Sequence, residues 1–367
     1  MVSSSRFMGE LYAKRLHALR GRLENAGVEA LLVTHPPNWF YLIGFTGEAG
    51  ALLVGRRSAI LATDGRFAAQ ARSEVRGAQV TTSQGSVFKT VVVWLGQQSI
   101  NRVAFDPSRL TVSQLHAVRR SAGAGVAWVP LAGVVEGLRS VKNASEIAQM
   151  RRAALLSSEV MENAVVSLKP GVRECEVAAE VEYQMRLRGA NGPAFETIVA
   201  SGLRSALPHA RPTAKHLRKN ELVVLDLGAI LGGYCSDLTR TVFLGRLPAR
   251  IRRWFLAVRE AQAAALKAAQ AGAVCGEVDA AARGVLAGCG LEKHFIHGTG
   301  HGLGLEVHER PRLARGQKET LQAGHVVTIE PGVYVEGVGG IRIEDEVVIH
   351  SRGNEVLTRV SRDLIEL

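Results

Sequence analysis

The order of apolar and polar positions along the chain changes character near residue 140. Before this point, leucines at near-helical spacing predict a helix over about 11–23. Short apolar runs bounded by turn residues predict strands in three segments, 29–45, 50–63 and 101–106. This alternation is typical of a small α/β domain, which we expect to cover residues 1–140.

Longer helical patterns begin directly afterwards. The first has Asn143 or Ser145 as a plausible N-cap and stops before Pro170. Three more helices are predicted, over about 174–188, 249–271 and 278–287. Strand-like hairpins lie between and after them, so we expect residues 141–367 to form an α+β domain. Two of these hairpins carry acidic residues, which hints at a duplicated half.

Composition and charge narrow the function classes. With 367 residues, of which 47% are hydrophobic, the chain is long enough for two domains and a buried core. Lysine and arginine exceed aspartate and glutamate by 45 to 34, which gives a net charge of +11. The basic residues form short, separate clusters without interleaved aromatic residues or a recognisable nucleic-acid module. They are interpreted as solvated helix faces, and no nucleic-acid partner is expected.

The four cysteines show neither CxxC spacing nor a Cys-rich cluster, so they are interpreted as reduced thiols. The N-terminal residues lack the apolar region of a signal peptide, and no apolar run reaches the ~20 residues of a membrane span. We therefore expect a cytoplasmic protein without a membrane partner.

The candidate chemistry lies in the second domain. Five residues suited to metal binding occupy its Gly-rich or strand-like stretches: Asp226, Asp237, His301, Glu330 and Glu344. In three of these stretches an acid interrupts an apolar run, and an unpaired buried carboxylate costs several kcal/mol. Two divalent cations would compensate this charge. Mostly oxygen ligands with one imidazole favour manganese or cobalt, with zinc as an alternative, and two such ions are suited to amide hydrolysis.

The spacing of Asp226 and Asp237 predicts that they lie together. Gly232-Gly233 suits a two-residue type I′ hairpin loop, because both central positions need a positive φ. With that loop, residue 226 faces Thr239 across the ladder, and Asp237 is its diagonal neighbour on the same face. The two carboxylates would then converge on a metal pair, whose ions usually lie about 3.5–4 Å apart.

A second hairpin carries the remaining acids. Glu330 ends an apolar run, and Pro331-Gly332 is expected to stop the ladder there. Period-2 alternation places Arg342 on the face of Glu344, so Arg342 is predicted to orient that carboxylate. His301 lies between two glycines, which allow close backbone approach and disfavour a helix.

Three more histidines lie beside these segments: His209, His297 and His308. They are candidates for holding a substrate or stabilising an oxyanion, although each alone could be an ordinary surface or core histidine. The alternative for each of the five ligands is an N-cap, a salt bridge or a turn residue. A phosphate-binding role for the Gly-rich stretch 297–304 is set aside, because its glycines do not fit the GxGxxG pattern.

Several segments resemble motifs of the pita-bread metallopeptidase family, and in particular its Xaa-Pro aminopeptidases and prolidases. These segments are SGLRSALPHARP, DLGAILGGYCSDLTRT, HGTGHGLGLEVHE, EPGVY and GIRIED. The resemblance covers residues 142–350, while YLIGFTGEAGALLV and TDGRF resemble more loosely the smaller creatinase-like domain of these proteins. It implies a pita-bread catalytic domain over 141–367, after an N-terminal domain that serves in dimerisation and as a lid on the partner's site.

The resemblance also implies roles for the metal ligands. Asp237 and Glu344 would bridge two ions. Asp226 would chelate one of them, while His301 and Glu330 would hold the other. Glu330 would in addition carry a proton between the attacking water and the leaving nitrogen.

Further residues match active-site positions of the proline-specific members. His209 and His308 would contact the substrate carbonyl and the developing oxyanion. His297 and Arg342 match further substrate-binding positions. Arg312 is a candidate anchor for the C-terminal carboxylate of a substrate.

Together these features predict a homodimeric Xaa-Pro aminopeptidase with two divalent metal ions, manganese first. A prolidase restricted to Xaa-Pro dipeptides is the first alternative, and a non-catalytic pita-bread binding protein is the second. The complete ligand set argues against the second alternative and against the creatinase-like branch, which has lost the metals. The additional N-terminal domain argues against methionine aminopeptidase.

Overall fold

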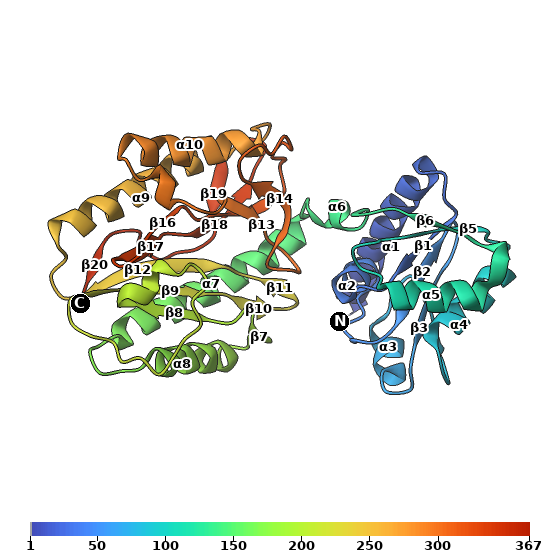
Figure 1. Ribbon diagram of the computed structural model, residues 1–367. Helices are drawn as coiled ribbons and strands as arrows, with labels where there is room; N and C mark the ends of the chain where they lie inside the picture. Colours follow the sequence, from blue (N-terminus) through green and yellow to red (C-terminus); the bar gives the residue numbers. More distant parts are fainter. Residues whose placement is uncertain (1) are drawn as a thin grey trace. The chain divides into compact units, whose positions relative to one another are not determined.

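The computed structural model describes residues 2–367 as two compact units, one ending at Arg139 and the other covering Ser140–Leu367 (Figure 1). None of the described helices combines the length and the apolar content that crossing a lipid bilayer would require.

The first unit contains one six-stranded sheet in the order β4-β3-β2-β1-β5-β6. Its strands are β1 (Ala30–Val33), β2 (Ala51–Gly55), β3 (Ala59–Thr63), β4 (Gln79–Thr82), β5 (Arg102–Phe105) and β6 (Ala127–Pro130). Its helices are α1 (Val2–Asn25), α2 (Pro36–Ile43), α3 (Ala68–Glu74), α4 (Val87–Gln97), α5 (Val112–Ala122), α6 (Glu136–Arg139) and the 3-10 turn η1 (Gly123–Gly125). Strand β1 runs antiparallel to β2 and parallel to β5, so the sheet is mixed.

The strand prediction for 29–45 is wrong after Val33. The chain forms α2 there, with prolines in its first two positions. Proline fits a helix start because its φ is already helical and the first N–H groups have no partner within the helix. Gly44, with a φ of 80°, ends the helix. The strands predicted in 50–63 and 101–106 are confirmed as β2, β3 and β5.

The second unit is built from helix pairs and sheets whose strands are antiparallel except for the parallel pair β12 and β20. Its helices are α7 (Ala144–Ser167), α8 (Glu174–Leu187), α9 (Ala249–Ala268) and α10 (Cys275–Gly288), with 3-10 turns η2 (Gly202–Ala206) and η3 (Glu292–His294). Its first strands are β7 (Gly192–Pro193), β8 (Ile198–Ser201), β9 (Glu221–Leu227), β10 (Ala229–Leu231), β11 (Tyr234–Cys235) and β12 (Leu238–Leu244). The later strands are β13 (Gly300–Gly302), β14 (Glu309–Leu313), β15 (Val326–Ile329), β16 (Gly332–Val335), β17 (Gly339–Arg342), β18 (Asp345–Ile349), β19 (Asn354–Val356) and β20 (Ile365–Glu366).

The four predicted helices of this unit are all present. The first is capped as expected, since the side chain of Asn143 accepts from the N–H groups of Ser145 and Glu146. The Glu146 side chain accepts in turn from the Asn143 N–H, which completes a capping box. The α+β class is therefore confirmed.

The second unit has two pairs of helices, each packed against its own set of strands. Helices α7 and α8 cover the sheet β20-β12-β9-β8, while α9 and α10 lie on the other side of the unit, against the strands β13–β18 (Figure 1). The unit has two apolar cores, one under α7 and α8 and one under α9 and α10, and the second also includes Leu222 of β9 and Phe243 of β12. The strands of the two halves meet where β12 contacts β17 and β18, and this is where the candidate ligands lie.

Candidate metal centre

The hairpin β9–β12 carries the first two acids in the predicted register. Gly232 and Gly233 have φ values of 57° and 85°, as a type I′ loop requires. Asp226 faces Thr239 across the ladder, and Asp237 lies directly before β12. The hairpin geometry predicted from the two glycines is confirmed.

His301 is presented by β13 between two glycines that tolerate no side chain. A Cβ on Gly300 would lie 1.9 Å from the Thr328 carbonyl oxygen, and one on Gly302 would lie 2.1 Å from that of Arg310. The strand can therefore lie tightly between β14 and β15. Nδ1 of His301 lies 3.1 Å from the Gly302 carbonyl oxygen, which leaves Nε2 directed at the acids.

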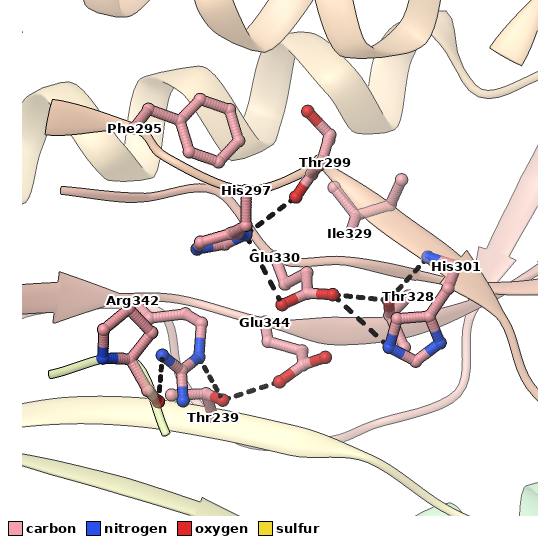
Figure 2. A network of polar contacts seen from close by, with 12 residues as sticks. Thr239, Phe295, His297, Thr299, His301, Thr328, Ile329, Glu330, Arg342 and Glu344 are labelled. Carbon is pink, nitrogen blue, oxygen red and sulfur yellow. Dashed lines mark hydrogen bonds and ion pairs between the residues drawn. The ribbon is translucent and has the colours of Figure 1, made fainter. Parts of the chain in front are cut away.

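The two glutamates lie at breaks in the strands. Glu330 follows β15, and its N–H donates to the Thr299 carbonyl at 2.8 Å. Glu344 lies between β17 and β18 and accepts a 2.6 Å hydrogen bond from the Thr239 hydroxyl. As Figure 2 shows, Glu330 lies between His297 and His301, with Glu344 close by.

The structure brings the five predicted ligands together. Ligand atoms of Asp237, His301 and Glu344 all lie within 4.8 Å of one another. Nε2 of His301 is 3.4 Å from Oε1 of Glu330 and 3.6 Å from Oδ2 of Asp237. Asp226 completes the group, because its charge acts on the other three acids.

Burial and mutual repulsion hold these acids towards their protonated forms. Burial raises the pKa of Asp237 well above its usual value, and the charges of Glu344 and Asp226 raise it further. Burial also raises the pKa of Glu344, again with help from neighbouring acids. For Glu330 the pKa rises to about 7, because burial outweighs the lowering effect of the Arg342 charge.

The imidazole of His301 behaves in the opposite way. Burial lowers its pKa to about 3, and the charge of His308 contributes to the shift. The ring is therefore neutral at physiological pH and offers a lone pair to a cation. Since the acids must lose protons to act as ligands, cation binding at this site has to release protons.

The donor set fits divalent cations. Oδ1 of Asp226 is buried without a hydrogen-bond partner, as expected of an oxygen reserved for a metal ion. Repelling carboxylates around a neutral imidazole need added positive charge. The residues that could hold such ions are Asp226, Asp237, His301, Glu330 and Glu344.

The predicted partner of Arg342 needs correction. Its Nη2 lies 2.5 Å from Oδ2 of Asp226. Thr239 links it to Glu344, because the Thr239 hydroxyl accepts from Arg342 Nε and donates to Glu344 (Figure 2). The alternation argument is right about the face, since the side chains of Arg342 and Glu344 both contact the Thr239 hydroxyl, but it did not identify Asp226 as the direct partner. Arg342 therefore orients the first hairpin's acid from the second hairpin.

His297 and Tyr334 form a polar wall beside Glu330. Nε2 of His297 is 2.9 Å from the Tyr334 hydroxyl, and Nδ1 is 4.0 Å from Oε2 of Glu330. Burial, with the Arg342 charge, lowers the pKa of His297 to about 4. Arg342 donates to the Tyr334 hydroxyl at 2.6 Å. Tyr334 was missed at the sequence level, where its only signal is the tyrosine of EPGVY.

The remaining candidates lie near the centre but are more exposed. The ring of His308 lies edge-on to that of His301, with centroids 4.3 Å apart. The charge of His209 contributes, after burial, to lowering the pKa of His297 and of His308. Arg312 stands opposite His301 in the β13–β14 ladder. Its side chain is exposed, so it is available to an anionic ligand.

Buried carboxylates that converge on a neutral imidazole are typical of metal-dependent hydrolases, and this site places the protein in that class. Residues 148–351 match metallopeptidase family M24, and residues 15–141 match the creatinase/prolidase N-terminal domain. The chain belongs to metallopeptidase family M24. It is a metallopeptidase whose pita-bread domain follows a creatinase-type N-terminal domain, as the resemblance implied.

The similar proteins include an Xaa-Pro dipeptidase and an X-Pro aminopeptidase. The chain is 33% identical over 344 residues to an Xaa-Pro dipeptidase of Pyrococcus horikoshii. The aligned region covers 94% of this chain and 96% of that protein. The structure of an Xaa-Pro dipeptidase from Bacillus anthracis matches with a TM-score of 0.94 and 36% identity, over 97% of this chain and 100% of that one. The structure of an X-Pro aminopeptidase from Thermotoga maritima matches with a TM-score of 0.87 and 34% identity, over 94% of this chain and 100% of that one.

Proposed function

We propose that this chain is an Xaa-Pro dipeptidase that uses two divalent cations to hydrolyse the amide bond before proline. Manganese is the preferred candidate for these cations. The observation that carries the proposal is the convergence of Asp237, His301 and Glu344 within 4.8 Å. The names of its relatives support a dipeptidase more strongly than the aminopeptidase that the sequence analysis put first. The similarity to an X-Pro aminopeptidase keeps that activity as the alternative.

In this proposal Asp226, Asp237, His301, Glu330 and Glu344 would hold the cations. When bound, such cations supply an activated water nucleophile near neutral pH and polarise the scissile carbonyl. Arg342 holds Asp226 in place through the 2.5 Å contact with its Oδ2. Thr239 does the same for Glu344.

The other residues act on protons and on the substrate. Glu330, which lies beside His297 and His301, is proposed to take a proton from water and return it to the leaving proline nitrogen. His209 and His308 are proposed to donate to the substrate carbonyl and to the oxyanion. His297, held by Tyr334, is proposed to bind the substrate beside Glu330.

Metal removal and chain length test this function together. The purified protein should lose the release of alanine from Ala-Pro after EDTA treatment, and Mn²⁺ should restore it. Ala-Pro-Ala should be a much poorer substrate than Ala-Pro. The opposite preference would indicate an aminopeptidase. The absence of metal-restorable release, with no metal retained through native purification, would instead support a non-catalytic binding protein.

Arg312 is proposed as the anchor for the substrate's C-terminal carboxylate. Arg312→Ala is expected to raise KM for Ala-Pro by about ten- to a hundredfold, because a hydrogen bond to a charged group contributes about 1.5–3 kcal/mol. The substrate Ala-Pro-amide lacks the carboxylate, so its KM should not change. Arg315→Ala is the control, since Arg315 is exposed and pairs with Glu292. Equal effects on both substrates would exclude this role.

The assembly and location of the protein are also proposals. We propose a homodimer in which the N-terminal domain serves in dimerisation and as a lid on the partner's site, as the family resemblance implies. A cytoplasmic location is proposed as well. A mass of about twice 39.4 kDa by light scattering would support the dimer, and a mass of one chain would exclude it.

A further inference from the structure

One buried carboxylate joins both ends of the loop 201–213, which carries His209. Oε1 of Glu174 accepts from the N–H and the hydroxyl of Ser201, at 2.9 and 2.8 Å. Its Oε2 accepts from the N–H and the hydroxyl of Thr213, at 3.1 and 2.7 Å. Glu174 is buried, so the two loop ends meet at a carboxylate in the protein interior.

The backbone beside Glu174 strengthens this junction. As the first residue of α8, Glu174 has an N–H group without a partner inside the helix. It donates to the carbonyl of Lys215 at 3.0 Å, and the N–H of Cys175 donates to that of Thr213 at 3.0 Å. Arg204, within the loop, pairs with Oε2 of Glu174 at 3.1 Å. The start of α8 therefore donates backbone hydrogen bonds to the segment at the end of the loop and accepts hydrogen bonds from both loop ends.

The middle of the loop rests on the strand that carries Arg342. The N–H of Gly340 donates to the Ser205 hydroxyl at 2.8 Å, and a Cβ on Gly340 would lie 2.2 Å from the Ser205 carbonyl oxygen. Nη1 of Arg342 donates to the carbonyl of Pro208 at 3.3 Å. His209, the next residue, thus follows a backbone group that is fixed to the same arginine as Asp226.

We propose that Glu174 is a positioning residue for His209: it closes the loop 201–213 and thereby sets where the imidazole stands relative to the metal ligands. Glu174 touches neither the substrate nor the ligands. The inference rests on the proposed function, in which His209 contacts the substrate. It adds a residue that acts through the backbone from α8.

Glu174→Gln provides the decisive change. The side chain keeps its size, but its amide nitrogen cannot accept hydrogen bonds, so either the Ser201 pair or the Thr213 pair loses its acceptor. The charge that holds Arg204 is lost as well. Since a displacement of about 1 Å can cost about a hundredfold in rate, kcat/KM for Ala-Pro should fall by about ten- to a hundredfold.

A double-mutant cycle separates positioning from general damage. In a His209→Ala protein the imidazole is already absent, so adding Glu174→Gln should lower kcat/KM by less than about twofold. A general loss of structure would lower activity by the same factor in both backgrounds, and that result would overturn the inference. The starting protein must first show metal-dependent hydrolysis of Ala-Pro. Its failure there would reject the proposed function, whereas full activity of Glu174→Gln would reject only the role of Glu174.

Hydrogen exchange gives a readout that does not depend on activity. Amide exchange in 201–213 should become faster in Glu174→Gln, while the strands β9 and β15 stay protected. Glu146→Gln is the matched control, since Glu146 is also a buried carboxylate in the first turn of a helix and accepts from the Tyr234 hydroxyl at 2.9 Å. It should change thermal stability without changing exchange in the loop or kcat/KM. Unchanged exchange in the loop of Glu174→Gln would contradict the proposal.

Discussion

Asp237→Asn is expected to abolish hydrolysis and at the same time to stabilise the metal-free protein. Asparagine keeps the shape of the side chain but removes one of the acids that would bridge the cations. Because divalent ions contribute several kcal/mol of transition-state stabilisation, kcat/KM should fall by at least about a thousandfold. Activity on Ala-Pro with saturating Mn²⁺, together with the bound metal per chain, measures this loss.

The gain in stability follows from the sign of the pKa shift. Burial and then the neighbouring acids raise the pKa of Asp237 in the folded protein. An acid with a raised folded pKa lowers stability as the pH rises above its unfolded value of about 3.9. Without metal, Asp237→Asn should therefore have a higher melting temperature than the unchanged protein at pH 8. Its free energy of unfolding should be larger by on the order of 1–2 kcal/mol, and this difference should shrink towards pH 4.

A control and a contrary result are available for this prediction. Glu355→Gln removes an acid that pairs with Arg151 on the surface, so it should leave both metal binding and the metal-free melting temperature nearly unchanged. If Asp237→Asn melted lower than the unchanged protein at pH 8 without metal, repulsion among the buried acids would not be the dominant electrostatic effect in this site.

The first hairpin could be predicted because its geometry is local. Two adjacent glycines select a type I′ loop, and the loop length alone then fixes which residues face each other. The pairing of Asp226 with Thr239 follows by counting from the loop. The cap at Asn143 is equally local, since its partners lie two and three residues away.

Long-range contacts could not be predicted in the same way. The choice of Asp226 rather than Glu344 as the direct partner of Arg342 depends on how two separate hairpins meet. The Glu174 carboxylate accepts hydrogen bonds from Ser201 and Thr213, which lie 27 and 39 positions away in the sequence. Helix α2 was missed for another reason: its prolines mark either a turn or a helix start, and the sequence pattern does not distinguish them.

The arrangement of the two halves explains why the acids need cations. Asp226 projects from a strand of one apolar core, between Leu225 and Leu227, while Glu344 follows Ile343 of the other core. Each half therefore brings carboxylates to the place where the strands of the two halves meet. Folding gathers these charges because the apolar residues around them must be buried, and divalent cations bound there would offset the repulsion between the carboxylates.

Arg342→Met is expected to cause a larger loss of stability than the other substitutions proposed for this protein. The Arg342 guanidinium compensates the charge of the Asp226 carboxylate whether or not metal is bound. The guanidinium is buried and contacts Asp226, Thr239 and Tyr334. Removing one partner of a buried ion pair typically costs about 3–5 kcal/mol, and methionine keeps much of the volume. Urea unfolding of the metal-free protein measures this cost directly.

The same variant should behave differently once cations are supplied. Cations bound by Asp226 would replace part of the lost positive charge, so the loss measured with saturating Mn²⁺ should be clearly smaller than the loss measured in EDTA. Arg259→Met is the matched control, because Arg259 pairs with Asp363 on the surface and should cost less than about 1 kcal/mol in either condition. Equal losses for Arg342→Met with and without Mn²⁺ would mean that Asp226 does not face the cations, and the proposed ligand set would then lose one of its members.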